Sequence, residues 1–179
     1  MARNRAVFFD RDGTLVEAIM REGFSKPTAP FNLDELHFCE GALHVLNALR
    51  NRGFKVLMVT NQPDVAHGYL SERDWERVHR WIIYKLQFRP DEVFMCRHIT
   101  ADNCGFKKPS PLMIRYAACV HDLDLQKSHI VGDTRNDVVA GHEAGLRSTI
   151  LIKRPYNADV QSSDFVVLSL FEVLKLPIF

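Results

Sequence analysis

The chain has 179 residues, of which 46% are hydrophobic and 25% are charged, and its formal net charge is +1. This length predicts one domain, residues 1–179, with a single sizeable core. A charge so close to zero excludes the bulk attraction that binds nucleic acid or an anionic membrane, and no apolar run approaches the ~18 residues of a membrane span. We therefore expect a small-molecule partner. No coiled-coil pattern indicates an oligomer, so we expect a monomer.

The N-terminal run MARNRAVFFD enters the predicted fold within a few residues, unlike a signal peptide. Four cysteines in a chain without a secretion signal predict free thiols or a metal site rather than disulfides. Both observations favour a cytoplasmic protein.

Strand and helix patterns alternate along the chain. In chain order they predict a strand over Ala6–Phe9, a helix over Gly41–Asn51, a strand over Lys55–Thr60, a helix capped by Ser71, a strand over Glu92–Cys96, a helix over Leu112–Val120, a strand over His129–Val131, a helix over Asn136–Ala144 that ends at Gly145, and a strand over Thr149–Ile152. Several strands are rich in Val, Ile and Phe without alternation, which is typical of strands covered on both faces. The order predicts an α/β fold with a mostly parallel, five-stranded sheet between helices.

Polar residues follow four of these strands. The strand ends carry, in order, Asp10 and Asp12, Thr60 and Asn61, Lys107 and Lys108 after a loop, and Asp133 and Asp137. Parallel strands bring such residues together at one edge of the sheet. Carboxylate oxygens suit a hard cation such as Mg²⁺, and lysine and hydroxyl donors suit a phosphate. Together they predict metal-assisted phosphoryl transfer.

The two closely spaced acids of the first motif have distinct predicted roles. Asp10 ends its strand and is the expected nucleophile that forms an aspartyl-phosphate. Asp12 would protonate the leaving alkoxide and then activate water. Like charges this close oppose each other's ionisation, so a cation between them is expected. The alternative is a turn pair that only caps a loop.

The remaining polar residues would bind the metal ion and the substrate. The expected magnesium ligands are Asp10, Asp12, Asp133 and Asp137, and the expected phosphate or substrate contacts are Thr60, Asn61, Lys107, Lys108 and Thr134. Structural alternatives exist: Thr60 and Asn61 would close a turn, Lys107 would be a surface charge, and Asp137 would be a first-turn acid of a helix.

The motifs DRDGT, TNQ, KKP and GDTRND resemble, in order, the four motifs of the haloacid dehalogenase superfamily of phosphohydrolases. They span residues 10–137. The resemblance implies a Rossmann-like three-layer sandwich and a Mg²⁺-dependent phosphatase with an aspartate nucleophile. The short intervals between the motifs leave no room for a separate cap domain, so an open site is expected. The alternatives are an idle phosphate-binding member of the fold and a nucleic-acid 3′-phosphatase, which the near-neutral charge disfavours.

Two capless subfamilies are especially similar. DRDGTLVE and AHGYLSERDWERVHRWI resemble the heptose 1,7-bisphosphate 7-phosphatases, whereas the short loop CRHITADNCGFKKPSP has the length seen in the histidinol-phosphate phosphatases. The run AIMR and His67 depart from the heptose enzymes. Arg21 or Lys26 would reach a second phosphate there, with a solvated surface charge as the preferred interpretation.

The Cys/His loop departs from both subfamilies, which hold a structural zinc with four ligands. Cys96, His98 and Cys104 match three of them, but Phe106 occupies the fourth position. Structural zinc requires four tetrahedral ligands. Asp102 or a water would have to complete the shell; the alternative is a loop held by packing, with Phe106 as an apolar plug.

Overall fold

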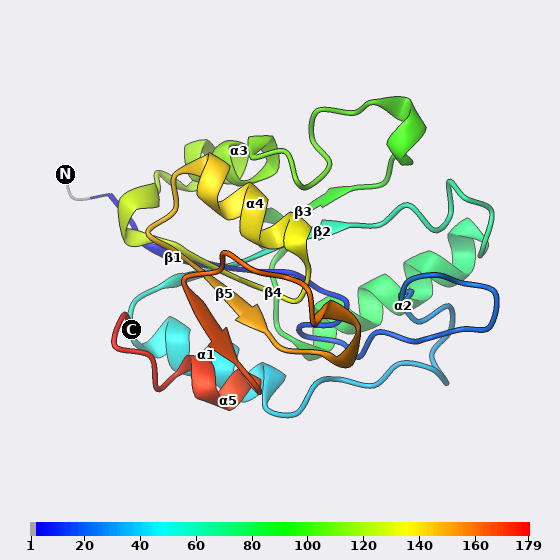
Figure 1. Ribbon diagram of the computed structural model, residues 1–179, viewed down its shortest axis with the longest axis horizontal. Coiled ribbons are helices and arrows are strands. Elements are labelled where there is room, and N and C mark those ends of the chain that lie inside the picture. The colour runs from blue at the N-terminus through cyan, green and yellow to red at the C-terminus, as the bar shows by residue number, and fades with distance from the viewer. Residues whose placement is uncertain (1–2) are drawn as a thin grey trace.

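Uninterrupted apolar strands form the centre of the computed structural model, which describes residues 3–179 (Figure 1). The strands are β1 (Ala6–Phe9), β2 (Lys55–Asn61), β3 (Val93–Cys96), β4 (His129–Gly132), β5 (Ser148–Ile152) and β6 (Phe165–Val167). They lie in the order β3-β2-β1-β4-β5-β6, and all pairs are parallel. All residues of β1, β4 and β5 are buried, as expected of central strands covered on both faces.

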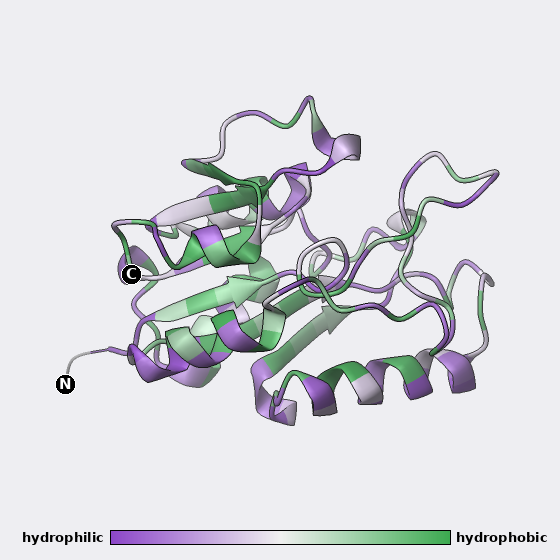
Figure 2. Ribbon diagram, turned by 90° about the horizontal axis from the view of Figure 1, so that it is seen from below, coloured by the Kyte–Doolittle hydropathy of each residue, from purple (hydrophilic) through white to green (hydrophobic). Residues whose placement is uncertain are grey.

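Helices cover the two faces of the sheet. They are α1 (Ala42–Asn51), α2 (Glu72–Lys85), α3 (Leu112–His121), α4 (Arg135–Ala144) and α5 (Leu170–Val173). Apolar residues of α1, α2 and α5 pack in one core cluster, and those of α3 and α4 pack in the other. Figure 1 shows α3 and α4 above the sheet with α1 and α5 below it, and Figure 2 shows that the strands are mostly hydrophobic. This three-layer α/β sandwich is the predicted fold class.

The prediction of five strands was wrong, because β6 adds a sixth. It has three residues and pairs with β5 at the edge of the sheet, with Ile150 opposite Phe165. Val166 is 56% exposed, so this strand lacks the continuous burial that marks the central ones. A three-residue run is too short to show a periodicity in the sequence.

The predicted helix ends agree with the structure to within one or two residues. Ser71 caps α2, and its hydroxyl oxygen accepts a hydrogen bond from the Asp74 amide at 3.1 Å. Gly145 ends α4 at a φ of +84°. Among the described residues, no helix is both long enough and apolar enough to cross a bilayer.

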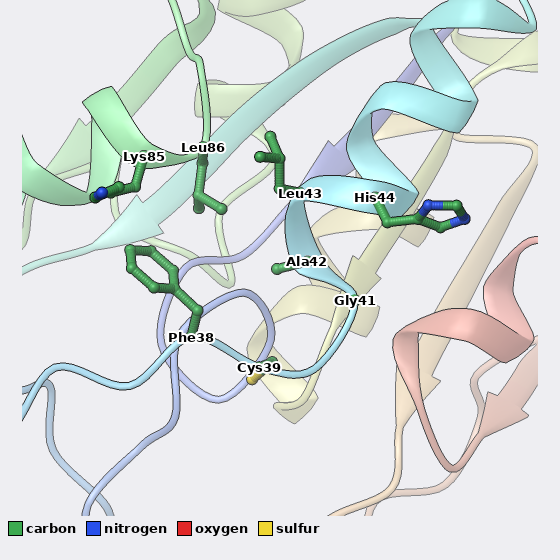
Figure 3. Close-up of a pocket in the computed structure, with 8 residues that line it drawn as sticks. All are labelled: Phe38, Cys39, Gly41, Ala42, Leu43, His44, Lys85 and Leu86. Atoms are coloured by element: carbon green, nitrogen blue, oxygen red, sulfur yellow. The ribbon is translucent and has the colours of Figure 1, made fainter.

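A mostly apolar cavity of about 330 Å³ lies between the start of α1 and the end of α2 (Figure 3). It is lined by Phe38, Cys39, Gly41, Ala42, Leu43, His44, Lys85 and Leu86. None of these side chains offers a carboxylate or a hydroxyl, so this cavity lacks the groups that were predicted for phosphoryl transfer. Those groups are expected at the carboxyl edge of the sheet.

Candidate active site

Three carboxylates meet at the carboxyl ends of β1 and β4. One oxygen each of Asp10, Asp133 and Asp137 lies within 4.8 Å of the others, and all three side chains are buried. The close approach of β4 to α4 depends on Gly132, because a Cβ atom there would lie 2.4 Å from the Asp137 side chain. The predicted convergence of motifs one and four is therefore present.

Lys108 completes this cluster from the loop that follows β3. Its Nζ lies 2.9 Å from Asp10 Oδ1 and 2.5 Å from Asp137 Oδ1, and it donates to the Val59 carbonyl at 2.8 Å. The residue is only 3% exposed. A buried ammonium is tolerated here because two carboxylates and a carbonyl oxygen surround it.

Burial and mutual repulsion shift the acidity of these groups. Burial raises the pKa of Asp10 to about 7; Lys108 opposes this shift, while Asp137 and Asp12 add to it. Burial likewise raises the pKa of Asp133 to about 8, together with repulsion from Asp10 and Asp137. Burial alone would lower the pKa of Lys108, but its two carboxylate partners outweigh burial and raise it. Burial and the mutual repulsion of the acids therefore disfavour the charged forms of Asp10 and Asp133 even beside the lysine.

Asp12 stands apart from the three-carboxylate cluster. Arg11 Nε donates to both Asp12 oxygens at 3.0 Å, and Gln62 Nε2 donates to Oδ2 at 2.5 Å. Arg11 is 1% exposed, and Gln62 also accepts from Trp75 Nε1 at 3.3 Å. The Asp12 carboxylate is thus oriented by charge-assisted hydrogen bonds and lies outside the group of three converging acids, and its expected role as a magnesium ligand stays a prediction.

Two residues of α2, Trp75 and His79, contact the site, and neither contact was predicted from the sequence. His79 lies 3.5 Å from Arg11 Nη1, and its ring stacks on Trp75 at 4.8 Å. Burial lowers the pKa of His79 to about 4, and the neighbouring Arg11 charge acts in the same direction. A neutral imidazole beside the guanidinium is therefore expected at neutral pH. The sequence shows Arg11 only as a residue of the first motif, and the motif does not reveal that its buried side chain pairs with Asp12.

The expected phosphate-binding residues fall into two groups. Thr60 is 1% exposed beside the site, and its hydroxyl accepts from Gln62 at 2.9 Å. The Asn61 amide instead forms two hydrogen bonds with the Lys108 backbone, at 2.9 and 3.0 Å. Lys107 Nζ donates to the His98 carbonyl at 2.7 Å. The amide of Asn61 and the ammonium of Lys107 are therefore engaged in holding the loop that carries Lys108.

Asp137 is a first-turn acid of α4 that also faces Lys108. Its Oδ2 accepts from the Thr134 backbone at 3.0 Å and from the Thr134 hydroxyl at 2.5 Å, which caps the start of α4. Its Oδ1 faces Lys108. The capping bonds fix the carboxylate in the orientation in which it meets the lysine. The Thr134 hydroxyl is likewise used within the protein.

Arg21, in the loop between β1 and α1, is paired within the protein. Arg21 forms an ion pair with Glu35, donates to Thr28 at 2.8 Å and lies 3.9 Å from the centre of the Phe31 ring. It is thus neither the solvated charge that was preferred nor a free cation.

Asp64 was missed in the sequence. Burial raises the pKa of its carboxyl, and the nearby negative charge of Asp12 adds to this; the side chain has no hydrogen bond among residues 3–179.

Three donors of the Cys/His loop lie close together. Cys96 Sγ is 3.6 Å from His98 Nδ1 and 3.9 Å from Cys104 Sγ. Phe106 packs against the core and meets Tyr116 edge-on at 5.8 Å. The Asp102 carboxylate accepts from the Ile99 amide at 2.9 Å, so it caps its own turn. The loop therefore presents three of the four ligands of a closed zinc site.

Comparisons with known proteins agree with this arrangement. The family model for HAD (haloacid dehalogenase) hydrolase-like proteins matches residues 105–165. A D-glycero-β-D-manno-heptose-1,7-bisphosphate 7-phosphatase of Helicobacter pylori is 30% identical over 92% of this chain and 95% of its own. The corresponding α-anomer phosphatase of Burkholderia mallei is 33% identical over 84% of this chain and 80% of its own.

Solved structures share the fold. A D,D-heptose 1,7-bisphosphate phosphatase from B. bronchiseptica, complexed with magnesium and phosphate, superposes with a TM-score of 0.77 at 24% identity over 96% of this chain and 98% of that one. A HAD-like phosphatase from Mesorhizobium loti gives 0.75 at 26% identity, over 97% and 85% of the two chains.

Fold, site and relatives together define a phosphatase of the α/β class. The chain belongs to the haloacid dehalogenase-like hydrolase family, which the resemblance of its four motifs had implied. Within that family, the curated relatives compared above are heptose-bisphosphate 7-phosphatases.

Proposed function

We propose that this phosphatase removes a phosphate from D-glycero-D-manno-heptose 1,7-bisphosphate, with Mg²⁺ as cofactor and Asp10 as nucleophile. The observation that carries the proposal is the meeting of Lys108 with three buried carboxylates at the carboxyl edge of the sheet. The substrate is proposed from the relatives, which include both β- and α-anomer enzymes. We therefore propose the heptose bisphosphate without choosing its anomer, which the assay below determines.

The first step uses Asp10 and Asp12. One Asp10 oxygen attacks phosphorus while the bond to the sugar oxygen breaks, and Asp12 gives its proton to that oxygen. Asp10 Oδ1 faces Lys108, whereas Oδ2 has no hydrogen-bond partner within the described part of the chain. Lys108 would neutralise the phosphoryl oxygens beside it.

The second step returns the enzyme to its starting state. A water oxygen attacks phosphorus, its proton passes to Asp12, and the bond between phosphorus and Asp10 breaks to release inorganic phosphate. Arg11 and Gln62 hold the Asp12 carboxylate through both half-reactions. A general acid and base that is fixed in place avoids the loss of about 10²-fold in rate that a 1 Å misplacement can cause.

The donor set fits Mg²⁺. Asp10, Asp133 and Asp137 offer carboxylate oxygens within 4.8 Å of one another, and burial, with repulsion between the acids added, raises the pKa values of Asp10 and Asp133. Hard oxygen ligands of this kind are those that Mg²⁺ prefers. When bound, the ion would supply positive charge opposite the phosphoryl oxygens. The Asp12 carboxylate, held by Arg11, lies outside this cluster of three acids.

A substrate panel tests the function. Phosphate release with Mg²⁺ would be measured from both anomers of the heptose bisphosphate, histidinol phosphate, glycerol phosphate and a nucleotide. We expect the highest kcat/KM for a heptose bisphosphate. A preference for histidinol phosphate would overturn the substrate and make the short Cys/His loop the better guide. No release from any ester would contradict the activity itself.

Mg²⁺ binding is expected to strengthen as the pH rises. The pKa values of about 7 for Asp10 and about 8 for Asp133 lie above the value of 3.8 for a free aspartate, so the folded protein without metal binds these protons more tightly than the unfolded chain. The contribution of both groups to stability is thus largest below about pH 4 and is lost as the pH rises through about 8.

Protons compete with the cation for the same oxygens. Melting curves with and without Mg²⁺ from about pH 5.5 to 8.5 should show a stabilisation by Mg²⁺ that grows with pH; a pH-independent difference would contradict this.

For the Cys/His loop we propose that packing around Phe106, rather than zinc, holds the structure. Three donors are in place, but Phe106 occupies the fourth position and Asp102 is engaged in its own turn. A closed structural site requires a fourth ligand. We expect dialysis against a zinc-selective chelator to leave the melting temperature unchanged. Stoichiometric zinc whose removal lowers the melting temperature would show that the three-ligand site is structural.

A further inference from the structure

Side chains from the segment that follows β5, residues 153–157, contact the site from outside the four motifs. Arg154 Nε donates to the Gly13 carbonyl at 2.9 Å. Asn157 Nδ2 donates to the Asp133 carbonyl at 2.7 Å and to the Ile152 carbonyl at 2.9 Å. These bonds tie the segment both to the turn of the first motif and to the backbone of the fourth.

Tyr156 of this segment contacts the Asp133 side chain directly. Its hydroxyl donates to Asp133 Oδ2 at 2.7 Å, while the Thr14 hydroxyl donates to Oδ1 at 3.2 Å. Tyr156 therefore makes the shorter of the two hydrogen bonds that orient this carboxylate. Asp133 is 2% exposed, so solvent has little access to replace a lost donor.

The turn of the first motif closes over this pair. Gly13 has a φ of +81°, and a Cβ atom on it would lie 2.1 Å from Asp133 Oδ2 and 2.5 Å from the Tyr156 hydroxyl oxygen. The hydroxyl and the carboxylate are thus packed against a bare glycine backbone.

We propose that Tyr156 is a positioning residue that sets the affinity of the site for its divalent cation by fixing the Asp133 carboxylate. This inference rests on the proposed function, in which Asp133 is a magnesium ligand. Partners that hydrogen-bond to ligating carboxylates fix their orientation, and their loss typically costs 10–100-fold in metal affinity. Tyr156 and Thr14 each donate one hydrogen bond to Asp133, which leaves its remaining lone pairs available to the cation.

Calorimetric titration of the purified protein with MgCl₂ tests the proposal, with Tyr156→Phe as the variant. This change removes one oxygen and keeps the ring. We expect a Kd for Mg²⁺ about 10–100-fold above that of the wild type. At saturating Mg²⁺ we expect kcat to stay within about threefold of the wild type, so that the defect lies in metal binding. Tyr84→Phe makes the same change on α2, at a side chain that is 71% exposed, and should bind Mg²⁺ as the wild type does.

The outcomes separate this inference from the proposed function. Equal Mg²⁺ affinity in the wild type and Tyr156→Phe would overturn the role of Tyr156 and leave the proposed function intact. A wild-type protein that binds no Mg²⁺ would overturn the proposed function as well. Melting curves without metal show whether Tyr156→Phe is folded, and a second variant, Tyr156→Leu, should weaken Mg²⁺ binding at least as much because it also lacks the donor.

Discussion

Asp10→Asn is expected to lower phosphate release by at least about 10⁴-fold, because an uncharged amide cannot attack phosphorus. Asparagine has nearly the shape of aspartate, so the end of β1 should keep its place between β2 and β4. The backbone amide of residue 10 still donates to the Val131 carbonyl, at 3.0 Å in the wild type. The loss should therefore appear in kcat, with the melting temperature little changed.

The matched control for this variant is Asp34→Asn, which makes the same change on an exposed loop residue. It should retain wild-type turnover. Steady-state kinetics on the best substrate of the panel would measure both variants. If Asp10→Asn kept a tenth or more of the wild-type kcat, Asp10 would not be the nucleophile.

Lys108→Met is expected to lower both stability and turnover. Methionine fills a similar volume but leaves Asp10 and Asp137 buried without the ammonium that lies 2.9 and 2.5 Å from them. Breaking a buried ion pair in this way costs about 3–5 kcal/mol, and each kcal/mol shifts the melting temperature of a chain this size by about 2–4 °C. Loss of the charge beside the phosphoryl group should reduce kcat by about 10²–10³-fold.

The stability defect of Lys108→Met should depend on pH. The pKa of Asp10 is about 7 even with the lysine present, so this carboxyl is protonated near pH 5 and carries no charge that needs a partner. The difference in melting temperature between variant and wild type should therefore be larger near pH 8 than near pH 5. Lys127→Met, on an exposed side chain, should melt as the wild type does at both pH values. An equal melting temperature of Lys108→Met and the wild type near pH 8 would contradict the proposed ion-pair network.

The sequence predicted the parts of the site that depend on strand ends. Asp10, Asp133 and Asp137 follow buried apolar strands and Lys108 follows β3 after a loop, and parallel pairing brings these strand ends to one edge. The same argument could not show which oxygen faces which donor. That the Asn61 amide binds the Lys108 backbone depends on how the loop after β3 turns back toward β2.

Contacts between distant segments explain what was missed. The Arg11–His79 contact requires α2 to lie beside the first motif, and the Tyr156–Asp133 bond joins residues 23 apart in sequence across the end of β5. Neither His79 nor Tyr156 lies in one of the four motifs. Arg21 was interpreted as a surface charge because nothing near it in sequence indicated that Glu35 would fold back to pair with it.

The most direct test of the account is to trap the intermediate. The enzyme would be quenched with acid during turnover of a substrate carrying ³²P in the phosphate that is released, and the labelled protein would then be digested and mapped. We predict a hydroxylamine-sensitive label, typical of an acyl phosphate, on the peptide that contains Asp10. Turnover without any covalent label, or a label on another residue, would contradict the assignment of Asp10 as the nucleophile.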